Sequence, residues 1–268
     1  MLVLILIWSV SGQALADTYR FSAPPRSGVE ESRSLFTPLM DLLSGRTGQT
    51  FVYIHPDGWF SYQTDIRKGR YDLLLDDAHF ASWRIASLGY LPLVRASSSV
   101  RFVAVAPRDG RVYSKEDLIG EPVCTYPPPD LGTVSFLRKF HGPFQVPRIL
   151  ATPDPLDRIK RLLAGECAAA VLSRHLYSES DEMRDVAHRL KIITQTDAYP
   201  GLTLTVNPRV PEALRNEIRG ILLSPAGQQA TAKLRNALAH GDDFVAASSK
   251  DYAGLAKLLA NYPGFEKP

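Results

Sequence analysis

Cysteine is scarce in this sequence, and histidine never clusters. The 268 residues include two cysteines, Cys124 and Cys167, and six dispersed histidines. Neither cysteine has a second Cys or a His at the spacing of a zinc site. We therefore expect no metal and no cofactor.

Catalytic motifs are also lacking. The sequence contains no G-x-S-x-G elbow, no H-E-x-x-H and no P-loop. Asp76 and Asp77 are neighbours in the chain, so their side chains diverge instead of converging as an acid and base pair. We expect a protein that is not an enzyme.

Neither sign of charge dominates. The 31 Lys and Arg residues nearly balance 28 Asp and Glu residues, which leaves a net charge of +3 with no long basic run. A nucleic-acid partner would need a basic patch, so we expect none. After residue 16 no apolar run is long enough to span a membrane, and no internal repeat is visible.

Residues 1–16 differ from the rest because they are apolar and carry no charged side chain. The run is short, and Ala14-Leu15-Ala16 fits a small-x-small cleavage site, so it predicts a secretory signal peptide and a periplasmic protein that starts at Asp17. The alternative is an uncleaved anchor. In an oxidising compartment Cys124 and Cys167 could form a disulfide; the alternative is two buried free thiols.

Alternating strand and helix patterns predict an α/β fold. The stretch Tyr71–Ile85, YDLLLDDAHFASWRI, reads as a buried strand, a polar turn and a helix. Strand and helix signals alternate before it and again over residues 122–173, as in two sheets flanked by helices. We predict two lobes, each a mostly parallel sheet, with crossings near residues 100–107 and 201–207. The first lobe would take residues 17–105 and 202–268, and the second, inserted lobe residues 106–201.

Residues at and just after the carboxyl ends of the strands are the candidate ligand-binding residues, because ligands bind at that edge of open α/β sheets. Those of the first lobe are Arg26, Ser27, His55, Trp59, Asp76, Asp77, His79 and Phe80. Those of the second lobe and the later crossing are Tyr126, Asp130, Gly132, Thr133, Asp154, Ser173, His175 and Tyr199.

Each candidate has a structural alternative. The aspartates are also suited to capping helices, and His79 to a buried structural hydrogen bond. Trp59 could serve lobe packing, and the residue 128–133 loop could be a rigid support. We expect Trp83 to lie in the core and Arg174 to be a solvated charge.

Four stretches in the same order resemble the phosphate/phosphonate-type periplasmic substrate-binding proteins of ABC transporters. They are YDLLLDDAHFASWRI, DLIGEPVCTYPPPDLGTVSFL, DPLDRIKRLLAGECAAAVLS and LKIITQTDAYPGLTLTVN. The resemblance implies a type 2 periplasmic-binding fold, ligand capture by lobe closure and an ABC permease as partner. We expect a monomer that binds a small polar molecule. The alternatives are a sensor for a membrane signalling partner and a cleft hydrolase or lyase.

One loop departs from the family pattern. Where many phosphonate binders place Ser-Thr-Ser-Gly, this chain has Pro128-Pro129-Asp130-Leu131 before Gly132-Thr133, and Pro153-Asp154 replaces a family histidine. Proline offers no N–H and Asp130 adds negative charge at the expected anion site. Together with Asp76 and Asp77, this loop suggests a cationic or zwitterionic ligand as a hypothesis.

Overall fold

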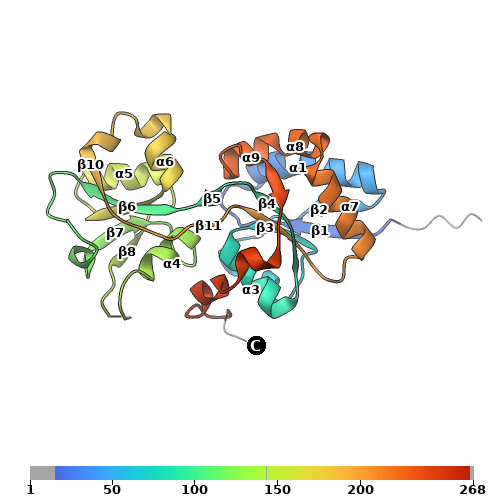
Figure 1. Cartoon of the computed structure of the whole chain (residues 1–268), viewed down its shortest axis with the longest axis horizontal. Coiled ribbons are helices and arrows are strands. Elements are labelled where there is room, and N and C mark those ends of the chain that lie inside the picture. The colour runs from blue at the N-terminus through green and yellow to red at the C-terminus, as the bar shows by residue number, and fades with distance from the viewer. Residues whose placement is uncertain (1–15, 143, 266–268) are drawn as a thin grey trace, which may run out of the picture.

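The computed structural model describes residues 16–142 and 144–265 of the chain. The predicted signal peptide falls almost wholly on residues outside these ranges. Within them, no helix is both long and apolar enough to cross a bilayer. Two lobes lie side by side along the long axis of the molecule (Figure 1).

The first lobe is built on a sheet of six strands with helices on both faces (Figure 1). Its order is β13-β4-β12-β3-β1-β2. Its strands are β1 (Thr18–Ser22), β2 (Thr50–Tyr53), β3 (Leu73–Asp76), β4 (Leu91–Ala96), β12 (Thr203–Val206) and β13 (Phe244–Ala246). Its helices and turns are α1 (Val29–Thr47), α2 (Trp59–Arg67), α3 (Ala78–Leu88), α7 (Glu212–Leu223), α8 (Pro225–Ala230), α9 (Ala232–Leu238), η4 (Ser249–Tyr252) and η5 (Leu255–Leu259).

The second lobe has five strands in the order β10-β6-β9-β7-β8. These strands are β6 (Phe102–Pro107), β7 (Pro122–Thr125), β8 (Arg148–Ala151), β9 (Ala169–Ser173) and β10 (Leu190–Gln195). The accompanying helices and turns are η1 (Glu116–Leu118), α4 (Leu131–Leu137), α5 (Pro155–Leu163), α6 (Arg174–Glu179), η2 (Asp181–Met183) and η3 (Ala187–Arg189). Cys124 and Cys167, whose pairing the sequence left open, are joined by a disulfide.

Most strands of each sheet run in one direction. In the first sheet β1 to β4 share a direction, while β12 and β13 are antiparallel to their neighbours. In the second sheet only β6 is reversed. This agrees with the predicted α/β fold with mostly parallel sheets. The carboxyl ends of β1 and β3 therefore share one edge, which is where ligands of such sheets bind.

The crossing between the lobes differs from the prediction. Residues 102–107 form β6, which pairs with β9 and β10, so this stretch belongs to the second sheet and the predicted boundary at 105/106 falls inside it. Residues 203–206 form β12 in the first sheet. The crossing itself is the short antiparallel pair of β5 (Ser99–Val100) and β11 (Tyr199–Pro200). An apolar run shows that a strand is buried, but it does not show to which sheet the strand belongs.

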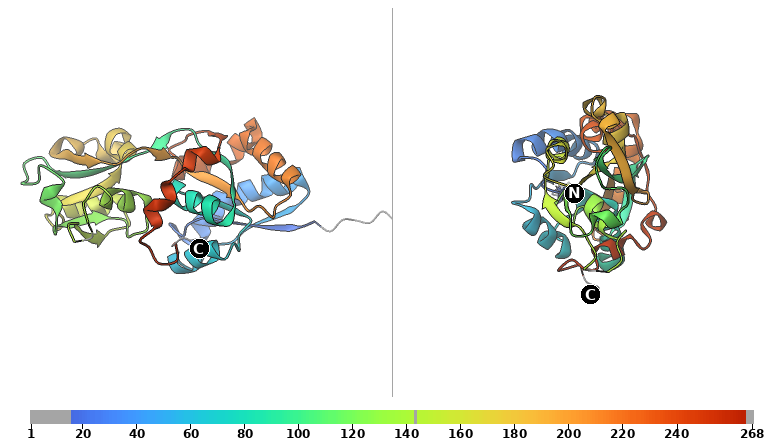
Figure 2. Two further views of the ribbon diagram at one scale, coloured as in Figure 1. Left: turned by 60° about the horizontal axis from the view of Figure 1, so that its bottom comes forward. Right: turned by 90° about the vertical axis from the view of Figure 1, so that its left-hand side faces the viewer.

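The C-terminal region is also divided more finely than expected. One predicted helix over 226–239 is two helices, α8 and α9, which meet at Thr231. The predicted helix near 250–259 is the two 3-10 turns η4 and η5, which lie against α3 and α4 (Figure 2). These turns therefore contact both lobes.

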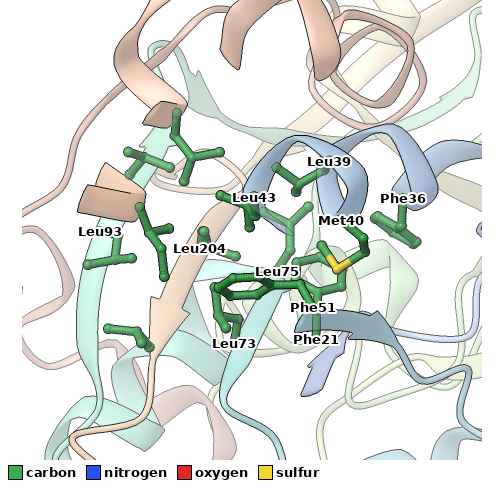
Figure 3. Packing of buried hydrophobic residues seen from close by; sticks show 14 of the residues in the cluster. Phe21, Phe36, Leu39, Met40, Leu43, Phe51, Leu73, Leu75, Leu93 and Leu204 are labelled. Atoms are coloured by element: carbon green, nitrogen blue, oxygen red, sulfur yellow. The ribbon is translucent and has the colours of Figure 1, made fainter. Parts of the chain in front are cut away.

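The main core of the first lobe lies between α1 and the sheet (Figure 3). Leu35, Phe36, Leu39, Met40 and Leu43 follow helical spacing, and all five are buried. They pack on buried side chains of β1, β2 and β3. This amphipathic pattern fixes which face of α1 meets the sheet.

Candidate functional site

The cleft between the lobes holds two adjoining compartments. The larger has a volume of about 520 Å³ and is lined by residues of both lobes and of the crossing strand β5. The smaller has about 260 Å³ and lies against β7, α4 and α5. Arg26, Phe102, Ser173 and His240 line both compartments. A site of this size and position is typical of a small-molecule binding cleft.

Arg26 and Asp77 form an ion pair on the first-lobe side of the cleft. The guanidinium of Arg26, in the loop after β1, forms an ion pair with the carboxylate of Asp77 at the start of α3. Burial acts to lower the pKa of Arg26, but the charges of Asp77 and Asp130 outweigh burial and raise it. Asp77 occupies the N-cap position of α3, yet its side chain makes no capping bond. Its carboxylate therefore serves Arg26 and not the helix.

The N-terminus of α4 is capped from within the second lobe. Asp130 Oδ1 accepts a hydrogen bond from the Thr133 N–H at 3.2 Å. The Thr133 hydroxyl donates to the Tyr126 carbonyl and lies 2.8 Å from Thr125 Oγ1. Thr133 is fully buried, its amide and hydroxyl bond within the second lobe, and it lines neither compartment. The positive end of this helix already has a carboxylate.

Asp130 and Gly132 nevertheless line the smaller compartment. Burial raises the pKa of Asp130, the Arg26 charge opposes this, and the Asp77 charge adds to it. A Cβ atom at Gly132 would lie 2.7 Å from the ring of Phe102, which explains why this position has no side chain. The loop thus carries one carboxylate into the cleft and no free hydroxyl from Thr133.

Arg158 is the main residue of this site that sequence reasoning missed. It lies in α5, is only 9% exposed, and lines the smaller compartment. Its Nε, Nη1 and Nη2 atoms donate to the carbonyls of Thr152, Val171 and Pro153 at 2.7, 3.0 and 2.8 Å. Burial lowers the pKa of Arg158, although the Asp130 charge acts in the opposite direction. A signal was present: Arg158 shares the apolar face of α5 with Leu162, four residues later.

His79, Trp59 and Tyr199 contact the other lobe or the crossing and do not line either compartment. The Nε2 atom of fully buried His79 lies 2.8 Å from the Pro129 carbonyl oxygen. Burial lowers the pKa of His79, so the ring is neutral, and Nε2 carries the proton because a carbonyl only accepts. Trp59 meets Tyr126 edge-on with ring centroids 6.1 Å apart. Tyr199 packs in an apolar cluster with Leu131 and Val134 of α4.

Four other predicted ligand residues are also engaged elsewhere. Asp76 is fully buried and pairs with Arg84, while Phe80 is fully buried in the core. His55 Nδ1 lies 2.9 Å from the hydroxyl of Tyr53, and exposed Asp154 caps α5. None of the four lines either compartment, because a strand end places a residue near the edge without fixing its direction.

Three of the remaining candidates line the cleft. Tyr126 and Ser173 line it from the second lobe, and so does His175. Ser27 lies beside Arg26 in a much smaller neighbouring cavity of about 20 Å³. Arg174 is exposed as expected, and it also lines the larger compartment. Other lining residues that the sequence did not indicate are Ser98, Ser99, Arg101, Phe102, Glu179, Leu238, His240 and Asp242.

The cleft has no arrangement suited to a metal ion. No group of three or more His, Cys, Asp or Glu side chains that could hold a metal occurs within residues 16–142 and 144–265. The carboxylates Asp76, Asp77 and Asp130 are held by Arg84, by Arg26 and by the N-terminus of α4. The polar groups of the cleft are therefore suited to hold a solute by hydrogen bonds and charge.

Comparison with known proteins identifies the family. Residues 21–252 match the family of phosphonate periplasmic substrate-binding proteins of ABC transporters. The chain belongs to this family. It is therefore a periplasmic solute-binding protein of ABC-transporter type, with a small-molecule ligand and a permease as partner.

Solved structures share the two-lobed fold of this family. XAC2383 from Xanthomonas citri, bound to ATP, has a TM-score of 0.74 at 14% identity and covers 94% of this chain and 98% of its own. PhnD1 from Prochlorococcus marinus, in complex with methylphosphonate, has a TM-score of 0.68 at 13% identity. The match covers 91% of this chain and 97% of PhnD1. A binding protein of a phosphonate ABC transporter from Pseudomonas aeruginosa has a TM-score of 0.65 at 13% identity. The match covers 91% of this chain and 85% of the Pseudomonas protein. No curated protein matches the chain.

Proposed function

We propose that this substrate-binding protein captures a small polar solute in the two-compartment cleft and delivers it to its permease by closing about β5 and β11. The observation that carries the proposal is a cavity of about 520 Å³ whose lining comes from both lobes and the crossing. Within the described residues, the chain passes between the two sheets through the short β5 and β11 pair. A ligand that contacts both walls stabilises the closed state by its greater affinity for it.

Several related properties belong to the same proposal. Residues 1–16 act as a signal peptide, so the working protein starts at Asp17. It acts as a monomer and turns over no substrate. N-terminal sequencing of the exported protein and its sedimentation mass test the first two properties. Recovery of unchanged solute after long incubation tests the third.

Thermal unfolding of residues 17–268 with a solute panel tests binding. The panel contains phosphate, phosphonates, amino acids and organic cations. A ligand at about 100 times its dissociation constant adds roughly 2.7 kcal/mol and raises the melting temperature by several degrees. A solute that stabilises the protein is then tested for closure.

Tryptophan fluorescence reports closure because Trp59 touches Tyr126 of the second lobe. Trp83 is the matched control, since it lies in α3 and its ring is buried against Phe265 near the C-terminus. We expect the ligand to change the fluorescence of the wild type and of Trp83→Phe, while Trp59→Phe gives no change. If the solute stabilises the protein against heat but changes the fluorescence of Trp59→Phe and Trp83→Phe equally, capture by lobe closure is contradicted.

A further inference from the structure

Resting on the proposed function, we propose that Arg158 binds an oxyanion group of the solute in the smaller compartment. The solute's remaining part extends past Arg26 into the larger compartment. The chemistry is that of a phosphonate, a phosphate monoester or a carboxylate that carries a polar body. The binding group is a buried side chain of α5 and not the N-terminus of α4.

The charge of Arg158 carries this inference. The residue is 9% exposed, and all three of its hydrogen-bond acceptors are neutral main-chain carbonyls. Among the residues that the structure describes, no carboxylate forms an ion pair with Arg158, although the charge of Asp130 in the same compartment acts on it. A buried charge whose hydrogen-bond partners are all neutral is costly, and an anionic ligand would offset that cost.

Arg158 also retains hydrogen-bonding capacity. A guanidinium carries five N–H donors, and the three carbonyl bonds leave two of them, one on each Nη atom. The residue lines a compartment of about 260 Å³ together with Tyr126, Ser173 and Arg26. Planar N–H donors beside hydroxyl groups suit the oxygen atoms of a phosphoryl or carboxyl group.

The N-terminus of α4 is the competing anion site, and it is already occupied. Asp130 caps the helix, and the Thr133 hydroxyl bonds to the main chain of the same loop. A cationic solute is disfavoured for the same reason. Asp77 pairs with Arg26, Asp76 pairs with buried Arg84, and Asp130 binds the Thr133 N–H. Of the other carboxylates that line the cleft, Glu179 pairs with His175, and Asp242 accepts a hydrogen bond from Ser98. These five carboxylates are therefore engaged.

The adjoining compartment sets the expected size of the solute. It has about 520 Å³ and shares the wall formed by Arg26, Phe102, Ser173 and His240. The side chain of Arg101 lines it without a hydrogen-bond or ion-pair partner among the described residues. We therefore expect a body with hydroxyl or further anionic groups to bind more tightly than inorganic phosphate.

Binding titrations on the chain from Asp17 test the inference. The probes are inorganic phosphate, methylphosphonate, glycerol 2-phosphate, succinate and the cation choline. We expect at least one oxyanion probe to bind, with glycerol 2-phosphate or succinate tighter than phosphate, and no binding of choline. The phosphorus probes and succinate distinguish a phosphoryl head from a carboxyl head.

Three variants locate the binding group. Arg158→Gln should weaken the bound oxyanion about 10- to 100-fold. Because Arg158→Gln also removes carbonyl bonds, Arg158→Lys supplies a second test: it keeps the charge and should lose less affinity. Arg108→Gln is the matched control, since Arg108 also donates to two main-chain carbonyls of this lobe but lies outside the cleft.

Asp130→Asn should change the affinity for an oxyanion and the affinity for a cation in opposite directions. Asn retains the helix cap but removes the negative charge, so it should tighten an oxyanion and weaken a cation. Choline binding that Asp130→Asn abolishes, or oxyanion binding unchanged in both Arg158 variants, would overturn the inference while solute binding stands. No response to any oxyanion also overturns it. The proposed function fails as well only if the broad solute panel gives no response.

Discussion

His175 stacks on His240 across the cleft, with ring centroids 3.8 Å apart and an angle of 25° between the planes. His175 belongs to α6 of the second lobe, and His240 lies between α9 and β13 of the first. Both line the larger compartment. The two rings therefore form a direct contact between the lobes that closure must make and opening must break.

This contact should weaken at acid pH. Partial burial and the neighbouring His175 lower the pKa of His240 below its ordinary value of 6.5. Separating the lobes would return the pKa of His240 toward its ordinary value, so the open state binds a proton on His240 more strongly than the stacked state does. The stacked state therefore loses stability relative to the open state as the pH falls below about 6.5. The charged groups nearby are Glu179 and Arg174 on α6 and Asp242 beside His240.

Small-angle scattering from pH 7.5 to 5.0 measures this opening. We expect the radius of gyration of the ligand-free wild type to rise toward pH 5. His240→Asn removes the titrating ring and tolerates the positive φ of 54° at this position, so its radius should not change with pH. His188→Asn is the control and should follow the wild type. A wild-type radius that is constant with pH would contradict the prediction.

Asp76→Asn should strongly destabilise the first lobe. Arg84 Nη2 lies 2.7 Å from Asp76 Oδ1, and both side chains are fully buried. Removing one partner leaves an uncompensated buried charge, which costs about 3–5 kcal/mol. Urea unfolding measures this loss. Asp77→Asn, next along the chain, breaks a pair whose arginine is 34% exposed and should cost within about 1 kcal/mol. Equal losses in the two variants would refute the distinction.

The disulfide should contribute substantially to the stability of the second lobe. Cys124 and Cys167 are 43 residues apart, so their bond restricts the unfolded chain and is worth about 2–4 kcal/mol. The double variant Cys124→Ala/Cys167→Ala should unfold at a correspondingly lower denaturant concentration. Reductant should destabilise the wild type and leave the double variant unchanged. A wild type insensitive to reductant after unfolding and refolding would argue against the bond.

Gly201→Ala should disturb the crossing between the lobes. A Cβ atom at Gly201 would lie 2.8 Å from both the Ala96 side chain and the Ser98 carbonyl oxygen. The main chain must shift to accept it, at a cost of about 1–3 kcal/mol. Gly28→Ala is the control, because nothing lies within 4 Å of its Cβ position. Thermal unfolding compares the two, and an undisturbed Gly201→Ala would show that the crossing yields easily.

The sequence was sufficient for the features that follow from local patterns. The apolar run of residues 71–75 marked a buried strand, and the order of strands and helices marked an α/β fold with two lobes. The four stretches of family resemblance lie between residues 71 and 207, inside the match over residues 21–252. Periodicity and order along the chain carry this information, because each residue's exposure depends mainly on its own element.

Only the tertiary structure decided which polar side chains reach the cleft. Asp76 and Asp77 are neighbours, yet one is buried against Arg84 and the other pairs with Arg26 at the cleft. Arg158 reaches the cleft from a helix face that reads as core, and His240 meets His175 from the other lobe. The strand pattern locates the sheet edge, but the direction of each side chain there depends on partners distant in sequence. Those partners are neighbours only once the lobes have packed.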